Sequence, residues 1–274
     1  MNQKSKKLLS QARSRAQELS EHPVLSRYWG RLSLVVKGTT ARGNADRYSD
    51  IDLVFFAERR TRTSIIKGYC SAGLSSRKDG VCIMLKNGHY HIESFQQLEG
   101  YFADKDFVHI WECQNAIPLH DPNDAFQNRI DSFSVKLFEE PLPIIKEAYL
   151  KLQLDRDWMM QPLRRADSAA TFLYSARVIR RICQMAYLLD LKPYPPDKWL
   201  MHYMNTTRFG RKHKKSIAEY VNRIGAVSKL RKGKKLMDYP LYRDAMALVT
   251  EIGEVIRKRY NDPPWVVRWY NYSS

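Results

Sequence analysis

The first third of the chain alternates between one amphipathic helix and short β-prone segments. Apolar residues recur at helical spacing over residues 5–20, and His22-Pro23 ends this helix because the position before a proline disfavours helical backbone. Residues 31–37 and 51–57 are apolar and rich in β-branched or aromatic side chains, which favours strands. A turn-rich segment of polar residues separates the two predicted strands.

Two further β-prone segments, residues 81–86 and 89–95, flank the dipeptide Asn87-Gly88. Asn-Gly between two such segments is a strong hairpin signal, since a type I′ turn requires positive φ at both central residues. The first hundred residues are therefore expected to form a small mixed β-sheet with helices.

The pattern becomes helical after residues 118–122, a Pro-containing segment expected to be a turn between domains. Residues 169–191 and 242–260 carry apolar faces at helical spacing. We therefore predict an α+β protein, with a mixed-sheet domain over residues 1–122 and a helical, basic domain over residues 123–274.

Composition and charge narrow the class of protein. Hydrophobic residues make up 44% of the 274 positions, which excludes a fully disordered chain. The net charge is +17, and it is uneven: residues 1–142 carry 20 Lys/Arg and 17 Asp/Glu (+3), whereas residues 143–274 carry 26 and 12 (+14). A basic second half favours an acidic partner such as nucleic acid, although excess charge also aids solubility.

The cysteines and the termini suggest the compartment. Cys70, Cys82, Cys113 and Cys183 show neither metal-binding nor disulfide-scaffold spacing, which favours a reducing environment. The polar N-terminus lacks the apolar core of a signal peptide, and no apolar segment is long enough to span a bilayer. A cytoplasmic protein without membrane contact is expected.

The segment between the first two predicted strands carries the candidate chemistry. Gly38 would let the backbone approach a ligand closely, and the hydroxyls of Thr39 and Thr40 beside backbone N–H groups suit phosphate. Asp50 and Asp52 would share one face of the second strand, because side chains alternate along a strand. Two neighbouring carboxylates are stable beside a divalent cation, and Mg²⁺ is bound by such pairs together with substrate phosphates. A lone Asp-x-Asp is usually surface, but this order of elements suits phosphoryl or nucleotidyl transfer.

The residues GTTARG followed by SDIDLVFF resemble the motif of the nucleotidyltransferase superfamily with the DNA polymerase β-like fold, in the manner of the kanamycin and lincosamide enzymes. Thr39 stands where these enzymes usually have serine. The resemblance implies that Asp50 and Asp52 bind Mg²⁺, as one or two ions, with Mn²⁺ as a substitute. It also implies a third catalytic carboxylate on a later strand, which helps to hold the metal or acts as general base on the acceptor hydroxyl; Glu93 is the candidate and Asp79 the weaker alternative.

The resemblance further implies nucleotide binding, with ATP expected. Gly38, Thr39 and Thr40 form the candidate phosphate cradle, and Arg42 and Ser49 are further candidate nucleotide-binding residues; Thr39 and Arg42 would hold the β- and γ-phosphates. Lys198 in the second half could reach a triphosphate as a point charge, although a surface role is the ordinary one for such a lysine.

The strongest local charge lies in residues 208–235, with 11 Lys/Arg against one Asp/Glu (+10). Such a cluster suits a phosphate backbone, although basic segments are often simply solvated. The candidate nucleic-acid-binding residues are Arg211, Lys212, Lys214, Lys215, Lys229, Arg231, Lys232, Lys234 and Lys235.

The leading hypothesis is a Mg²⁺-dependent nucleotidyltransferase that moves a nucleoside monophosphate, with AMP expected, from a nucleoside triphosphate to an acceptor hydroxyl with release of pyrophosphate. The acceptor would be RNA, such as a tRNA end, a protein as in toxin-like enzymes, or a neutral or anionic small molecule. A polycationic aminoglycoside would be repelled by the basic half. The alternative from another class is a nucleic-acid-binding module with an inactive transferase fold. The sequence does not determine the oligomeric state.

Overall fold

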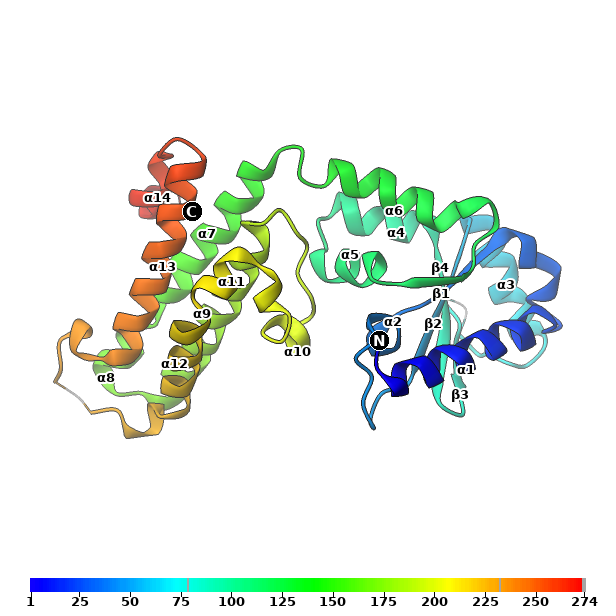
Figure 1. Ribbon diagram of the computed structural model, residues 1–274, viewed down its shortest axis with the longest axis horizontal. Helices are drawn as coiled ribbons and strands as arrows, with labels where there is room; N and C mark the ends of the chain where they lie inside the picture. Colours follow the sequence, from blue (N-terminus) through cyan, green and yellow to red (C-terminus); the bar gives the residue numbers. More distant parts are fainter. Residues whose placement is uncertain (78, 232, 273–274) are drawn as a thin grey trace. The chain divides into compact units, whose positions relative to one another are not determined.

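A mixed five-stranded sheet forms in the first part of the chain, and helices make up the rest (Figure 1). The computed structural model describes residues 1–77, 79–231 and 233–272, without the side chain of Lys229. The chain divides into two units, Met1–Glu139 and Glu140–Ser274, each with its own packed interior. The predicted α+β class, in which a mixed sheet precedes helices, is confirmed.

The strand order β3-β4-β2-β1-β5 places β2 at the centre of the sheet. The pair β2 and β4 is parallel, and the other neighbours are antiparallel. The strand bounds are β1 (Leu32–Val36), β2 (Ile51–Ala57), β3 (Cys82–Leu85), β4 (Gly88–Ser94) and β5 (Ile117–His120).

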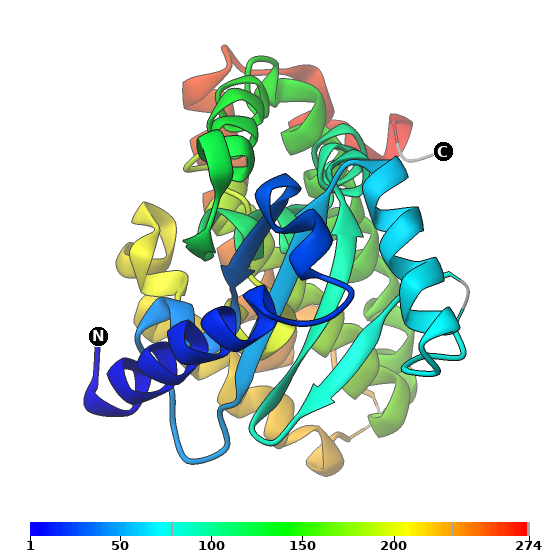
Figure 2. The ribbon, with the colours of Figure 1, turned by 90° about the vertical axis from the view of Figure 1, so that its right-hand side faces the viewer.

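Helices cover both faces of this sheet. The helices of the first unit are α1 (Gln3–Ser20), α2 (Gly38–Arg42), α3 (Arg59–Ser71), α4 (Phe95–Ala103), α5 (Phe107–Gln114) and α6 (Ala125–Lys136), with the short 3-10 helices η1 (Ser26–Arg31) and η2 (Pro122–Asp124). Helices α1 and α3 lie on one face (Figure 2), where Leu34, Leu53 and Ile92 join their apolar residues in one core. On the other face, Phe56 packs against Phe95 and Phe126, with ring centroids 6.2 and 5.1 Å apart.

The strand alternation decides which side chains are available for chemistry. Because successive side chains point to opposite faces, Asp52 of β2 and His89 and Glu93 of β4 lie on the face away from α1. That face is less completely apolar, and Lys37 at the end of β1 also belongs to it.

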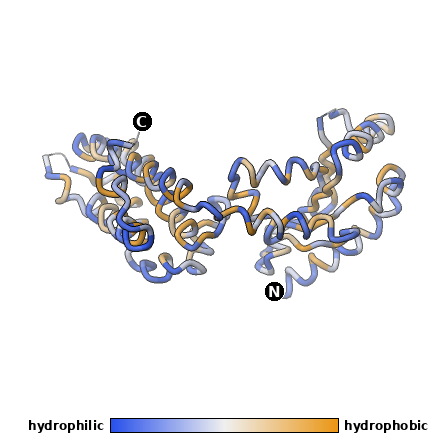
Figure 3. Tube along the Cα trace, turned by 90° about the horizontal axis from the view of Figure 1, so that it is seen from above, coloured by the Kyte–Doolittle hydropathy of each residue, from blue (hydrophilic) through white to orange (hydrophobic). Residues whose placement is uncertain are grey.

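The second unit is a helical bundle built around α9, whose Val178, Ile182 and Met185 are fully buried. Its helices are α7 (Pro141–Trp158), α8 (Met160–Arg165), α9 (Ser168–Leu188), α10 (Asp197–Leu200), α11 (Arg208–Lys212), α12 (Lys214–Gly225), α13 (Pro240–Arg259) and α14 (Pro264–Val267), with the 3-10 helices η3 (Met204–Thr206), η4 (Val227–Lys229), η5 (Leu236–Asp238) and η6 (Trp269–Asn271). Hydrophilic and hydrophobic residues alternate along these helices (Figure 3). Among the described residues, no helix combines the length and apolarity that crossing a membrane requires.

The predicted β3–β4 hairpin is present, but its turn is shifted by one residue. Leu85 pairs with Gly88, so the loop is Lys86-Asn87 and Gly88 already belongs to β4. Of Asn87 and Gly88, only Gly88 has a positive φ, at 146°, so the expected type I′ turn was wrong. A Cβ on Gly88 would lie 2.1 Å from the carbonyl oxygen of Ile51, so glycine is needed there for β2 to pair closely with β4.

Two boundaries differ from the sequence expectation. The segment expected to be a turn over residues 118–122 instead contains most of β5, which pairs with β1 at the sheet edge. An edge strand tolerates Pro118, which has no N–H to donate. The first unit then continues through α6 to Glu139, whereas the sequence placed the boundary at residue 122.

Candidate active site

Gly38 lies where β1 ends and α2 begins, and its environment admits no side chain. Its φ is 71°, in the left-handed region that favours glycine. A Cβ at this position would lie 2.5 Å from the Oδ2 atom of Asp52. The missing side chain therefore lets the strand end and the Asp52 carboxylate lie in direct contact.

The two threonines after Gly38 have different environments. Thr40 is fully buried, and its hydroxyl donates a hydrogen bond of 3.0 Å to the backbone carbonyl of Asp50. This bond fixes the chain at Asp50 and commits the Thr40 hydroxyl to a structural contact, so the expected phosphate contact from it is not available in this conformation. Thr39 is half-buried in the first turn of α2 and remains the candidate phosphate ligand.

Asp50, Asp52 and His89 form the one group of three potential metal ligands found among the described residues, with one ligand atom from each lying within 4.8 Å of the others. Asp52 pairs with His89 in the parallel β2–β4 register, and His89 Nδ1 lies 3.4 Å from Asp52 Oδ1. Asp50 is exposed, and the other two residues are half-buried. The two carboxylates suit a hard divalent cation such as Mg²⁺ or Mn²⁺, so Asp50 and Asp52 fit the implied metal, whereas the imidazole of His89 is a ligand that softer ions prefer.

Glu93, the predicted third carboxylate, is not part of this group. It pairs with Phe56, four residues beyond His89 on β4, which corresponds to about 13 Å along the strand. His89 instead occupies the place next to Asp52. The register of β2 on β4 causes this difference, because it aligns Asp52 with the start of β4 rather than with its end.

Glu93 lies in a buried polar network. His91 Nε2 is 2.8 Å from Glu93 Oε1, and the Tyr101 hydroxyl donates to Glu93 Oε2 at 3.1 Å. Burial would raise the pKa of Glu93, but the hydrogen bond from His91, the charge of Lys37 and the bond from Tyr101 together hold that pKa below its usual range. Glu93 is therefore ionised at neutral pH although it is only 9% exposed.

The partner charge is Lys37, which is 6% exposed at the end of β1. Burial would lower the pKa of Lys37, but Cys113, Glu93 and Glu112 raise it above its ordinary value. Burial raises the pKa of the Cys113 thiol to about 11, so this cysteine is neutral at physiological pH. The network therefore holds a buried carboxylate and a buried ammonium beside the proposed metal ligands.

Side chains of β4 connect the group of Asp50, Asp52 and His89 with the polar network around Glu93. The rings of His89 and His91 are stacked with centroids 5.9 Å apart, and His91 contacts Glu93. Asp52, His89, His91 and Glu93 therefore follow one another on one face of the sheet. Sequence reasoning missed His89 and Lys37 as members of this face; the alternation of His89, His91 and Glu93 was the available signal.

The other predicted nucleotide-binding residues lie in well-defined local contacts. Arg42 places its guanidinium 4.9 Å from the ring centroid of Trp111 in α5. Ser49 exchanges hydrogen bonds of 2.9 Å with Asp46, which close the loop before β2. Asp79, the weaker candidate for the third carboxylate, is 83% exposed at its side chain, 3.8 Å from Arg77.

The candidate residues of the second unit lie on its surface. Lys198 is exposed on α10. Within the basic segment, Lys212 pairs with Glu251 at 3.0 Å, so part of its charge is balanced locally. Arg211, Lys214, Lys215, Arg231, Lys234 and Lys235 are exposed, whereas Lys232 and the side chain of Lys229 lie outside the described residues.

Comparison with known protein families agrees with this geometry. Residues 23–120 match the family model of the nucleotidyltransferase domain. The chain is also similar to a solved structure of a nucleotidyltransferase-like protein from Exiguobacterium sibiricum 255-15. The match covers 89% of this chain and 75% of that protein, with 8% sequence identity and a TM-score of 0.46. No curated protein matches the chain.

Proposed function

Residues 23–120 belong to the nucleotidyltransferase superfamily, and from this we propose that the protein transfers a nucleoside monophosphate from a nucleoside triphosphate to an acceptor hydroxyl. The acceptor oxygen forms a bond to the α-phosphorus, and the bond from that phosphorus to the β-phosphate oxygen breaks. Pyrophosphate leaves, and the acceptor proton passes to solvent.

The observation that carries this proposal is the group Asp50, Asp52 and His89 next to Gly38. The three residues offer ligand atoms within 4.8 Å of one another, and the Asp52 carboxylate lies against the backbone of Gly38. A divalent cation bound there would polarise the phosphate oxygens and stabilise the charge that develops on the leaving group.

The residues around the group have separate roles in the proposal. Thr40 and Gly38 hold the backbone and carboxylates in place from the side of α2. Thr39 and the backbone N–H groups of α2 would contact the triphosphate. His89 contacts Asp52 at 3.4 Å and would fix the orientation of that carboxylate.

The metal and the nucleotide are also part of the proposal. We infer Mg²⁺ because one or two carboxylates together with substrate phosphates are its usual ligands, and Mn²⁺ would substitute because carboxylates suit it as well. ATP is the proposed donor on the family resemblance alone, with AMP as the group transferred.

The charge of the second unit supports an anionic acceptor. Arg211, Lys214 and Lys215 are exposed near the start of α12, and Arg231, Lys234 and Lys235 are exposed between η4 and η5. A polycation would be repelled by this unit, whereas a polyanion would be attracted.

The test is a transfer assay with each of the four NTPs labelled at the α-phosphate, incubated with total RNA or with a small-molecule extract. We expect the change Asp50→Ala/Asp52→Ala to abolish label transfer, with a loss of at least about 10³-fold, the several kcal/mol of charge stabilisation that a bound metal supplies. The matched control is Asp79→Ala/Asp104→Ala, which removes two exposed carboxylates elsewhere in the first unit. Full activity in the first variant, or equal loss in both, would contradict the proposal.

A further inference from the structure

A basic hollow of about 360 Å³ adjoins Asp50, between α1 and the end of the sheet where β2 begins. Its cationic lining residues are Lys4 and Lys7 of α1, Arg47 of the loop before β2 and Lys86 of the hairpin turn. Asp50 is the only carboxylate among the residues that line it, so four positive charges face one negative charge. The hollow therefore attracts anions to the immediate neighbourhood of the proposed metal ligands.

The positive charges of this hollow are not neutralised by the protein. Within the described residues, Lys4, Lys7 and Lys86 have no carboxylate within ion-pair distance. In contrast, Arg15 further along α1 forms an ion pair with Glu18. The free charge is thus concentrated at the end of the groove nearest Asp50.

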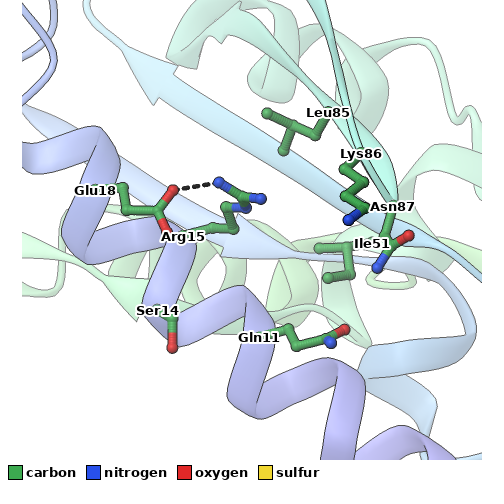
Figure 4. Close-up of a pocket in the computed structure, with 8 residues that line it drawn as sticks. All are labelled: Gln11, Ser14, Arg15, Glu18, Ile51, Leu85, Lys86 and Asn87. Atoms are coloured by element: carbon green, nitrogen blue, oxygen red, sulfur yellow. Dashed lines mark hydrogen bonds and ion pairs between the residues drawn. The ribbon is translucent and has the colours of Figure 1, made fainter.

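A second hollow, of about 280 Å³, continues the first along α1. The two share Gln11, Lys86 and Asn87, so they form one groove, which we call the α1 groove. Figure 4 shows side chains of α1 on one side of the second hollow and those of the hairpin and β2 on the other. From Lys4 to Glu18 the groove follows α1 for about 21 Å, which is longer than a single phosphate group.

The two ends of the α1 groove differ in chemistry. Lys4 and Lys7 line only the end near Asp50, and Lys86 lines both ends. The far end combines apolar Ile51 and Leu85 with polar side chains and the Arg15–Glu18 ion pair. The first composition suits phosphates, and the second suits a base, which has an apolar face and hydrogen-bonding edges.

An exposed aromatic side chain stands at the charged end. Tyr48 is 77% exposed, and the Arg47 guanidinium lies 4.6 Å from its ring centroid. An exposed tyrosine beside unpaired cations is the usual arrangement for stacking a nucleic-acid base.

We propose that the α1 groove binds the end of a single-stranded nucleic acid as the acceptor, with its phosphates on Lys4, Lys7 and Lys86 and its terminal nucleotide beside Tyr48 and Asp50. This inference rests on the proposed function, since it assigns the acceptor of the same site. It places the acceptor contact on the first unit, independently of the basic segment of the second.

The test measures equilibrium binding of a fluorescein-labelled 12-nucleotide oligouridylate to the full chain, without NTP. Lys4→Glu/Lys7→Glu should weaken binding at least fivefold. The negative slope of log K against log salt should become less steep by about 1.4, which is about 0.7 for each of the two phosphates that the variant no longer neutralises. The matched control, Lys6→Glu/Lys67→Glu, makes the same charge change on exposed lysines of α1 and α3 outside the groove and should change affinity less than twofold.

ATP binding, measured in parallel, separates the two sources of phosphate. We expect it to be unchanged in Lys4→Glu/Lys7→Glu, and Lys4→Gln/Lys7→Gln should give an intermediate loss of oligonucleotide binding if the folded protein is intact. Loss of ATP binding with unchanged oligonucleotide binding would assign the groove to the triphosphate and overturn the proposal. Equal loss in the control, or no oligonucleotide binding by the unchanged protein, would also overturn it.

The proposed function fails independently of this inference. A chain with Asp50→Ala/Asp52→Ala should lose transfer yet bind the oligonucleotide at least as tightly as the unchanged protein, because the α1 groove keeps its lysines. If that chain kept transfer activity, the proposed function would fail while the binding result still decided the groove.

Discussion

At the scale of single residues, Gly38 joins the backbone geometry to the chemistry of the site. Both its φ of 71° and its contact with the Asp52 carboxylate favour glycine. The sequence predicted the need for a close approach at Gly38, but it assigned the approach to a ligand. The structure shows that the atom nearest to the missing Cβ belongs to Asp52.

Gly38→Ala separates backbone strain from displacement of Asp52. Gly73 provides the control, since it has a similar φ of 69° but nothing within 4 Å of the position that a Cβ would take. We expect Gly38→Ala and Gly73→Ala each to lower the free energy of unfolding by about 1 kcal/mol. Only Gly38→Ala should reduce label transfer, by about 10²-fold, because it moves a proposed metal ligand. Equal transfer rates for both variants would show that the Asp52 position is not critical.

Glu93 gives a second prediction, on stability and its pH dependence. Because the carboxylate is buried against Lys37 and its folded pKa is lowered, its contribution is fully present above the unfolded pKa of about 4.3 and is lost as pH falls through the lower folded pKa. Glu93→Gln should therefore cost about 3 kcal/mol at pH 7, because the charge of Lys37 is then balanced only in part, by Glu112.

Urea unfolding of both proteins between pH 3 and pH 7 checks this prediction. The difference between the unchanged protein and Glu93→Gln should shrink below about pH 4, as Glu93 becomes protonated. A difference that did not shrink between about pH 4 and pH 3 would contradict the assignment of Glu93 as an ionised buried partner.

At the scale of elements, the pairing of β2 with β4 determines which side chains lie beside Asp52. Both strands were predictable, β2 because it is a largely apolar segment and β4 because it follows the Asn87-Gly88 hairpin signal. Their register was not, because it depends on Gly88 lying against Ile51, a contact between residues far apart in sequence. A shift of four residues along β4 separates the predicted ligand Glu93 from the observed neighbour His89. The edge strand β5 was missed for a related reason, since Pro118 and the polar His120 look like part of a turn without β1 beside them.

The first turn of α1 fixes the loop that leads to Asp50. Ser5 is fully buried, and its hydroxyl accepts a hydrogen bond of 2.8 Å from the backbone N–H of Ala45, while the Asn2 amide donates to the Ala45 carbonyl at 2.9 Å. The helix was predicted from its apolar spacing, but this long-range contact has no local signal in the sequence.

Ser5→Ala should therefore leave the Ala45 N–H without an acceptor and lower the free energy of unfolding by about 1–3 kcal/mol. Hydrogen exchange should become faster over residues 43–49 in particular. Ser10→Ala, at an exposed position of the same helix, is the control and should change neither quantity measurably. Unchanged exchange in Ser5→Ala would show that the loop is held by other contacts.

At the scale of the whole molecule, the chain consists of a mixed-sheet unit, in which residues 23–120 match the model of the nucleotidyltransferase domain, followed by helices. The order of these parts could be predicted, because the period of the apolar pattern changes along the chain. Their boundary could not, because α6 is helical like the second unit but packs with the first. The structure also shows where the net charge of +17 is paired and where it is not. Part of the charge of the basic segment is balanced by ion pairs such as Arg223 with Asp244, whereas the α1 groove places unpaired cations beside Asp50.

The central claim is that Asp50 and Asp52, rather than Glu93, hold the divalent cation. Binding of Mn²⁺, followed by electron paramagnetic resonance in the presence of a non-hydrolysable ATP analogue, tests it most directly. We predict that Asp50→Asn/Asp52→Asn weakens Mn²⁺ binding at least 100-fold, whereas folded Glu93→Gln binds Mn²⁺ within about threefold of the unchanged protein. Unaltered binding in the first variant, or an equal loss in the second, would contradict the account.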